Sequence, residues 1–321
     1  GRVASPPQSA IDFTNALNDA TQPASGTVGT PASEPPLAEQ PIAPATAEPP
    51  AGEDGGVQTY PLFDALARNA DKIRTVSARH EQATAYMALG YAKSTGRPSV
   101  YSVVPGPGVL NTGAALCTAY GVNAPIMCLT GQVPSEFLGR ERGHLRELAD
   151  QQATLSTFIK AAYRIEHPQD ANRKFAEAWR TMISGRQGPV SLETCWDTMT
   201  MAAELPAPAK VTPEVSPPID PTAIDAAVKF ITRAKRPMIM VGGGAQHASD
   251  AVRELAEKLN SPVVSHRGGK GVIPGDHPLA MDCVASYELW PETDVLIGIG
   301  SRLELQYMRW TGMQRMIHRA E

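Results

Sequence analysis

From Tyr60 onward, short apolar runs alternate with amphipathic segments of helical length, and this alternation constrains the fold more than any other feature of the chain. We expect strands at 74–78, 99–104, 125–130 and 190–194, and again at 237–241, 262–265 and 294–299. The expected helices cover 61–70, 80–94, 109–120 and 169–184, and then 222–234 and 248–259. Strands that alternate with helices form parallel sheets with helices on both faces. The pattern predicts an α/β protein with two doubly wound parallel-sheet domains.

One proline-rich stretch precedes these two domains, and another lies between them. Residues 1–56 form a low-complexity segment rich in Pro and Ala, which buries too little apolar surface to offset the entropy of ordering. We therefore expect a disordered N-terminal tail there. Five prolines between residues 203 and 220 predict a stiff linker over 201–220. The two expected domains are then 57–200 and 221–321.

Composition and charge exclude several classes of partner. The chain of 321 residues carries −4 and residues 1–58 carry −6, so the remainder carries +2, which argues against nucleic acid or an acidic membrane as the main partner. No run of roughly 18 apolar residues predicts a membrane span, and no signal pattern opens the sequence. The four cysteines form no CxxC pair, as is usual for reduced thiols in a cytoplasmic protein.

The segment Arg79–His–Glu–Gln82 places Glu81 where a helix is expected to begin. On its own, an acidic residue in the first turn of a helix is explained by the helix dipole. Further motifs follow in order: Gly90–Tyr–Ala92, Thr95–Gly96, Pro105–Gly–Pro–Gly108, Asn111 and Thr130–Gly–Gln–Val–Pro134. This order resembles the pyrimidine-binding domain of thiamine diphosphate (ThDP) enzymes and looks most like the acetolactate synthase group. Residues 237–245 and 294–300 resemble the central, Rossmann-like domain of that family.

For Glu81 the resemblance implies a catalytic role. In the family this carboxyl group hydrogen-bonds N1′ of the cofactor pyrimidine, which favours the imino tautomer that removes the proton from thiazolium C2. Ordinary acid–base catalysis implies that losing such a group costs about 10²–10⁴ in rate. The alternative is that Glu81 only stabilises the helix start. His80 would face a different side of that start, so we expect it to be structural.

The resemblance also implies a set of cofactor-binding residues: Pro105, Gly106, Pro107, Gly108, Asn111 and Gln132. A glycine turn that opens a helix allows close approach of its backbone and leaves N–H groups for polar atoms. Its alternative role is a tight strand-to-helix turn. Gln132 follows a buried strand at its carboxyl end, where open α/β sheets place ligands. Its alternative role is to cap the next helix.

Two further sites are weaker. Arg140 or Arg142, in a basic loop, would hold a substrate carboxylate, although such a loop is more often simply solvated. The glycines Gly242, Gly243 and Gly244 follow an expected strand and resemble a nucleotide-binding turn, but the GxGxxG spacing is missing. In the acetolactate synthase group this domain binds FAD, and in related decarboxylases it often binds nothing. FAD is therefore the less favoured outcome.

The sequence departs from the family pattern in several places. The diphosphate-binding domain with its GDG…N signature for Mg²⁺ is not found, and the nearest string, Gly52–Glu–Asp–Gly55, lies in the tail. We therefore expect no metal ligands in this chain. The opening helix and strand of the first domain are expected to be missing, and the central domain to be incomplete at its C-terminal end. Leu145–Arg–Glu147 stands where acetolactate synthases carry Phe–Gln–Glu.

These features lead to two hypotheses. The first is one half of a 2-oxo acid carboligase (a transferase) or decarboxylase (a lyase). It would activate ThDP through Glu81 and take its diphosphate- and Mg²⁺-binding domain from another chain, in a homo- or hetero-oligomer. The second is a truncated, non-catalytic fragment or a regulatory or assembly module. A third, narrower alternative is a nucleotide-binding module that uses only the Gly242 turn.

Overall fold

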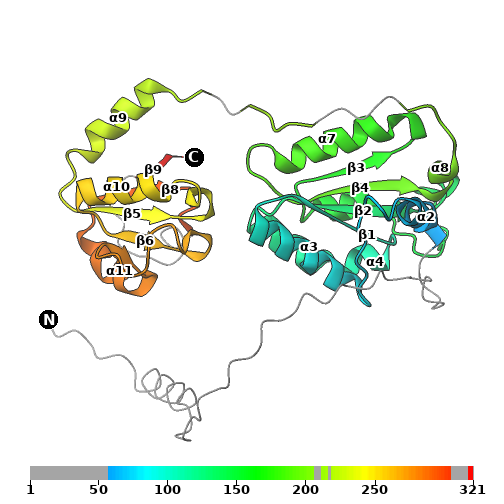
Figure 1. Ribbon diagram of the computed structural model, residues 1–321, viewed down its shortest axis with the longest axis horizontal. Coiled ribbons are helices and arrows are strands. Elements are labelled where there is room, and N and C mark those ends of the chain that lie inside the picture. The colour runs from blue at the N-terminus through cyan, green and yellow to red at the C-terminus, as the bar shows by residue number, and fades with distance from the viewer. Residues whose placement is uncertain (1–56, 206–210, 216–217, 305–316, 321) are drawn as a thin grey trace, which may run out of the picture. The chain divides into compact units, whose positions relative to one another are not determined.

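The structure is a computed structural model that describes residues 57–205, 211–215, 218–304 and 317–320 (Figure 1). The tail expected at 1–56 and part of the expected linker lie outside these residues. The described residues contain two separate sheets, both wholly parallel, which confirms the α/β class. None of the described helices is long and apolar enough to cross a membrane.

The first sheet has four strands in the order β1-β2-β4-β3. They are β1 (Ser99–Val103), β2 (Ile126–Gln132), β3 (Ala161–Ile165) and β4 (Val190–Cys195). In the register of the pairs, Val103 lies opposite Thr130 and Gln132 lies opposite Cys195. Because all four strands run the same way, their carboxyl ends share one edge, which is where sheets of this kind bind ligands.

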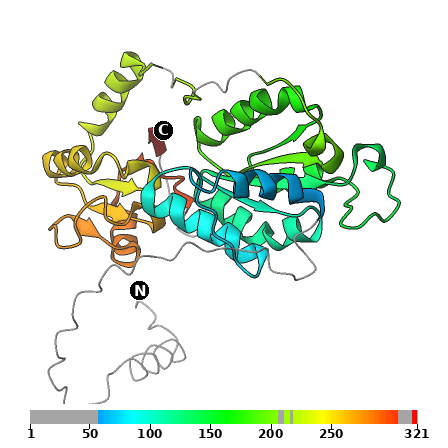
Figure 2. The same cartoon turned by 45° about the vertical axis from the view of Figure 1, so that its right-hand side comes forward.

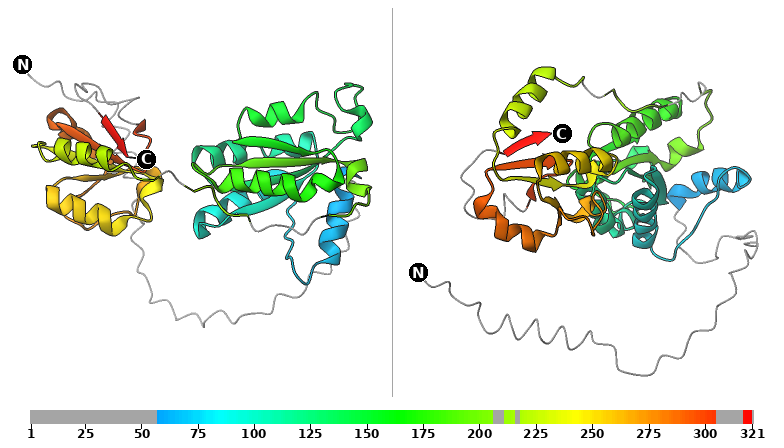
Figure 3. Two further views of the ribbon diagram at one scale, coloured as in Figure 1. Left: turned by 90° about the horizontal axis from the view of Figure 1, so that it is seen from above. Right: turned by 60° about the vertical axis from the view of Figure 1, so that its left-hand side comes forward.

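Helices cover both faces of this sheet (Figures 1 and 3). On one face pack α3 (Glu81–Thr95), α5 (Gly113–Gly121) and α6 (Gln151–Ser156). On the other face α7 (Ala171–Ile183) packs through Ala178 and Met182 onto Met127 and Val190. The buried residues of α3 are Ala85, Ala88, Leu89 and Ala92, at the spacing of one helical stripe. The small side chains of this stripe bring α3 close to the sheet.

The first sheet differs from the sequence-based expectation in three ways. Residues 74–78 are exposed and form no strand. A strand needs a hydrogen-bonded neighbour, and among the described residues β1 pairs only with β2. The helix expected at 109–120 is two helices, α4 (Pro107–Asn111) and α5, which meet at Thr112. Helix α6 and strand β3 were not predicted.

The second sheet has the order β7-β6-β5-β8-β9. Its strands are β5 (Pro237–Val241), β6 (Val263–Ser265), β7 (Ala280–Met281), β8 (Val295–Ile299) and β9 (Ile317–Ala320). Helix α10 (Ser249–Leu259) packs on the face that carries Ile239 and Val241. Helix α11 (Cys283–Leu289) lies on the face of Met238 and Met240 (Figure 2). Strand β5 is thus buried on both faces, as is usual for a central strand of a parallel sheet.

The remaining elements are short connections and three further helices, of which α9 (Pro221–Ile231) packs on the second core through Phe230 and Ile231. The other two are α2 (Tyr60–Arg68) and α8 (Trp196–Thr200). Single 3₁₀ turns are η1 (Val57–Thr59), η2 (Ser135–Phe137), η3 (Pro168–Asp170), η4 (Gly243–Ala245), η5 (Arg267–Gly269) and η6 (Trp290–Glu292). Helix α9 covers most of the predicted span 222–234 and ends at Ile231.

Candidate cofactor-binding site

Glu81 is the first residue of α3, and the residues around it fix the helix start. His80 is the N-cap: its Nδ1 accepts a hydrogen bond from the Gln82 N–H at 3.2 Å. This is the structural role expected for His80. Gly96, in the left-handed conformation with φ of 67°, ends the helix. Glu81 is half-buried, so its carboxylate reaches the surface while its backbone is held by the helix.

The structure brings Glu81 together with two other predicted residues, Asn111 and Gly108. Asn111 Nδ2 donates a hydrogen bond to Glu81 Oε2 at 3.0 Å from the last residue of α4. A Cβ atom on Gly108 would lie 2.6 Å from Cγ2 of Val104 and 3.7 Å from Cγ of Glu81. Gly108 therefore allows α4 to pass directly beside the carboxylate side chain.

The turn before α4 is tightly constrained at Gly106. Its φ is 61°, and a Cβ atom there would overlap the backbone carbonyl of Arg146. Both facts require glycine at this position. The Gly106 N–H, expected to be available to a ligand, instead donates a hydrogen bond to Gln151 Oε1 at 2.8 Å. The turn is thus bound to a residue 45 positions later in the chain.

Behind the turn lies a buried polar chain that the sequence analysis did not identify. Gln151 Nε2 donates to Glu193 Oε2 at 2.7 Å, and the Arg164 guanidinium pairs with Glu193 Oε1 at 2.5 Å. Gln151 and Glu193 are each 1% exposed. Burial raises the pKa of Glu193, while Arg164 and the Gln151 hydrogen bond act in the opposite direction. The sequence signal for this polar chain was a charged residue inside each of two strand-like runs, Arg164 in one and Glu193 in the other.

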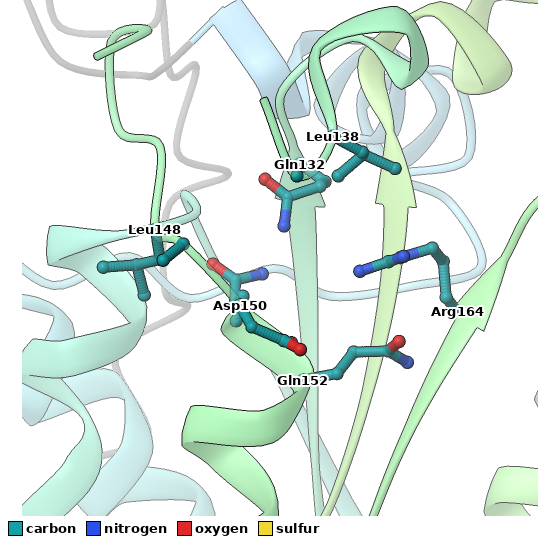
Figure 4. Close-up of a pocket in the computed structure, with 9 residues that line it drawn as sticks. Gln132, Leu138, Leu148, Asp150, Gln152 and Arg164 are labelled. Atoms are coloured by element: carbon teal, nitrogen blue, oxygen red, sulfur yellow. The ribbon is translucent and has the colours of Figure 1, made fainter. Parts of the chain in front are cut away.

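Gln132 lines a cavity of about 240 Å³ at the carboxyl edge of the first sheet. It is the last residue of β2 and 2% exposed, and its side-chain carbonyl accepts the Val133 N–H at 2.8 Å. Figure 4 shows its amide nitrogen and the Arg164 guanidinium pointing into the cavity. Gly139, Asp150 and Gln151 also line it. The Gln132 carbonyl thus fixes its own backbone, and its amide group faces the cavity.

Arg140 and Arg142 are both exposed and are not among the residues that line this cavity. They lie in the connection between η2 and α6, where Glu141 adopts a positive φ of 50°. The cation that borders the cavity is Arg164, on β3. The charge of Arg164 is shared with Glu193, and the carboxylate of Asp150 also faces the cavity.

The glycines Gly242, Gly243 and Gly244 lie after β5 and are packed against the protein's own backbone. A Cβ atom on Gly242 or Gly244 would overlap Gly300. The Gly242 N–H donates to the Ile299 carbonyl at 3.0 Å, and the Gly244 N–H donates to the Gly300 carbonyl at 3.1 Å. Close approach of two backbones is therefore sufficient to explain Gly242 and Gly244, whereas a Cβ atom on Gly243 would meet no atom closer than 3.9 Å.

Glu81, Asn111 and the Gly106 turn cluster beside the carboxyl edge of a parallel sheet. The described residues contain no group of three His, Cys, Asp or Glu able to hold a metal. The carboxyl edge of a parallel sheet is where the class of α/β domains with this architecture places its ligands. Two family models identify the ligand class. The model for "Thiamine pyrophosphate enzyme, N-terminal TPP binding domain" matches residues 55–154, and the model for "Thiamine pyrophosphate enzyme, central domain" matches residues 224–318. The chain belongs to the thiamine pyrophosphate (ThDP) enzyme family.

Curated relatives agree with this assignment. The chain is 32% identical over 256 residues to the acetolactate synthase isozyme 1 large subunit of Escherichia coli (strain K12), covering 78% of this chain and 45% of the relative. It is 33% identical to a probable 2-ketoarginine decarboxylase of Pseudomonas aeruginosa and 30% identical to an oxalyl-CoA decarboxylase of Escherichia coli, each over 77% of this chain and 45% of the relative. The chain spans about 45% of the length of these relatives.

Proposed function

We propose that residues 57–200 form the pyrimidine-binding domain of a ThDP-dependent enzyme that acts on 2-oxo acids, with Glu81 as its catalytic acid. Residues 201–220 would connect it to a central domain at 221–321. The observation that carries the proposal is the Glu81 carboxylate held by Asn111 at 3.0 Å beside Gly108. Bound ThDP supplies the thiazolium carbon that bonds to the 2-oxo acid.

The local geometry fits an aminopyrimidine ring. Glu81 Oε2 accepts the Asn111 hydrogen bond, and Oε1 makes no hydrogen bond within the described residues, so it is free to share a proton with a ring nitrogen. Gly108, which has no side chain, lies between Cγ2 of Val104 and Cγ of Glu81, so apolar atoms flank the Glu81 side chain. Glu81 would hold a proton at N1′ of the ring, while Pro105, Gly106, Pro107 and Asn111 would shape the wall beside it.

The diphosphate and Mg²⁺ of the cofactor would be held by a further domain. The described residues contain no cluster of metal-ligating side chains for Mg²⁺ and the diphosphate. The helix that begins at Glu81 also exposes Tyr86, Met87 and Tyr91, at 42%, 47% and 48%. Aromatic and Met side chains gathered on the exposed face of one helix are typical of an interface. A diphosphate-binding domain in a homo- or hetero-oligomer would cover this face and complete the site.

The relatives' names favour a 2-oxo acid as substrate and either a transferase or a lyase reaction. The substrate would enter near Gln132, with Arg140 or Arg142 as outer contacts. FAD is the less favoured ligand of the central domain, because the N–H groups of Gly242 and Gly244 are already bonded. We place the protein in the cytoplasm, because its four cysteines are spaced as reduced thiols usually are there.

The test is a reconstitution with two variants. ThDP and Mg²⁺ are titrated into the purified chain by calorimetry, and then into an equimolar mixture with a diphosphate-binding domain from this family. Consumption of pyruvate, as the probe substrate, is measured in the mixture. Glu81→Gln removes the catalytic carboxyl group, and Glu136→Gln removes the same charge from an exposed position on η2.

We expect weak, Mg²⁺-independent binding by the chain alone and turnover only in the mixture. Glu81→Gln should lower that turnover by about 10²–10⁴, while Glu136→Gln leaves it unchanged. Tight Mg²⁺-dependent binding by the chain alone would contradict the need for a second domain. A mixture that binds ThDP without turnover would favour the alternative, a non-catalytic fragment or an assembly module.

A further inference from the structure

We propose that Gln151 is the positioning residue for the Gly106 turn, and that Glu193 and Arg164 hold its amide in the orientation that this turn requires. The consequence for the cofactor rests on the proposed function. The positioning itself does not, because it concerns contacts within this chain.

Gln151 contacts three segments of the domain. It is the first residue of α6 and 1% exposed. Its Oε1 accepts the Gly106 N–H at 2.8 Å, and its Nε2 donates to Glu193 Oε2 at 2.7 Å on β4. A longer contact of 3.4 Å joins Nε2 to the Gly131 carbonyl on β2. One buried side chain thus ties the turn after β1 to two neighbouring strands.

A primary amide satisfies both ends of this contact at every pH, whereas a carboxyl group does so only while it is protonated. The Gly106 N–H can only donate, and an ionised Glu193 can only accept, so the side chain between them needs an acceptor on one side and a donor on the other. Arg164 pairs with the second oxygen of Glu193 at 2.5 Å, which leaves Oε2 for the Gln151 amide. The ion pair therefore determines which way the amide of Gln151 faces.

The position of the Gly106 turn matters because its backbone lies close to other parts of the domain. Gly106 has a φ of 61° and lies against the backbone of Arg146, itself at a positive φ of 67°. Two residues later, Gly108 lies beside Glu81. Movement of Gly106 would therefore move the backbone that lies against the carboxylate of Glu81.

The charged and titratable groups around Gln151 come from each element packed on it. Glu193 is on β4 and Arg164 on β3. Asp150 precedes α6, where its carboxylate accepts the Ala153 N–H at 2.8 Å. The thiols of Cys128 on β2 and Cys195 on β4 also lie within electrostatic range of Glu193, and burial raises the pKa of each to about 12, so both stay protonated at neutral pH.

The experiment follows the Gly106 amide by NMR in the full chain without ligand. Labelling proline at the carbonyl carbon and glycine at nitrogen selects glycines that follow proline, and the sequence has only Gly106, Gly108 and Gly275. Gly275 precedes β7 in the second sheet and serves as an internal control. The variant is Gln151→Glu, and the matched control is Gln152→Glu, which adds the same charge one residue later.

In Gln151→Glu, the new carboxyl group faces Glu193, and the two share a proton at low pH. We expect the Gly106 resonance to titrate between about pH 5 and about pH 8 as that proton is lost, because adjacent carboxylates repel. Solvent exchange of the Gly106 amide at about pH 8 should then be about tenfold faster than in the wild type. The wild type and Gln152→Glu should show no such titration, and Gly275 should not respond.

A Gly106 resonance in Gln151→Glu that matches the wild type at every pH, with equal exchange, would overturn the proposal. If that variant does not fold, Gln151→Met serves instead: it should accelerate Gly106 exchange about tenfold at all pH values, and unchanged exchange would again overturn it. The NMR experiment contains no cofactor, so its outcome is independent of the reconstitution. If Gly106 titrates as expected but the reconstituted mixture does not bind ThDP, the proposed function is rejected and the positioning role of Gln151 stands.

Discussion

Asn111 donates a hydrogen bond of 3.0 Å to the carboxylate of Glu81 from a helix that begins 26 residues after Glu81 itself. Both residues are partly exposed, so this contact adds little to the stability of the fold. It does restrict the rotamers of Glu81 and leaves only one carboxylate oxygen for a ligand. The relationship therefore matters more for the orientation of Glu81 than for folding.

Changing Asn111 should lower activity without unfolding the chain. Asn111→Ala removes the donor, and we expect ThDP-dependent turnover in the reconstituted mixture to fall about tenfold, the effect of one hydrogen bond to a charged group at a partly exposed site. Asn111→Asp also adds a carboxylate that repels Glu81, so its loss should be larger. Thermal unfolding of both variants should match the wild type. Full activity of Asn111→Asp would show that this contact does not position Glu81.

Arg164→Met should destabilise the first domain in a pH-dependent way. Burial raises the pKa of Glu193 above its ordinary value of 4.5, so the folded state binds the proton more tightly than the unfolded state. Stability is then lost as the pH rises above about 4.5, and it is lost more steeply without the Arg164 charge. We expect a deficit of about 3–5 kcal/mol near neutral pH and a smaller one in acid, measured by urea unfolding.

The double variant Arg164→Met with Glu193→Met is the control for that prediction. It removes both charges, so it should be more stable near neutral pH than Arg164→Met alone and should lose the additional pH dependence. A deficit in Arg164→Met that is the same at every pH would indicate lost packing of the long side chain instead of an unpaired buried carboxylate.

Lys160 stabilises the end of α7 through its amine. Its Nζ donates to the carbonyls of Thr181, Ser184 and Arg186 at 2.6, 2.8 and 2.8 Å. Lys160→Met should therefore lower the free energy of unfolding by about 2 kcal/mol, discounted for partial exposure. Lys258→Met, which removes an exposed ion pair with Glu254, should change it by less than about 0.5 kcal/mol. Equal unfolding midpoints for these two variants would contradict this assignment.

The glycine turn after β5 should behave as a packing feature. Gly242→Ala places a Cβ atom against the Gly300 backbone, so it should cost more than about 2 kcal/mol. Gly275→Ala has open space around it and should be close to neutral. We also expect that FAD and ADP leave the thermal unfolding midpoint of the chain unchanged, whereas a bound ligand would raise it. A concentration-dependent rise with either nucleotide would reverse our view of this turn.

The alternation of strands and helices was legible in the sequence because burial on two faces imposes runs of fixed length and period. It predicted β5 and its flanking α10, and the start of α3 at Glu81. It failed for residues 74–78, where a strand-like run is not enough without a neighbouring strand. It also missed β3, because Arg164 interrupts the apolar pattern and its charge is balanced only by Glu193 from another strand.

The sequence by itself determined the fold class, the family and the residues that belong to its ordered motifs, because each of these depends on local pattern. Only the tertiary structure decided that Asn111 holds Glu81, that Gln151 binds the Gly106 N–H, and that the backbone of Gly300 fills the space beside Gly242. These contacts join residues 30, 45 and 58 positions apart. Hydrogen bonds and close backbone approach depend on positions in space, and the order of residues along one segment does not encode them.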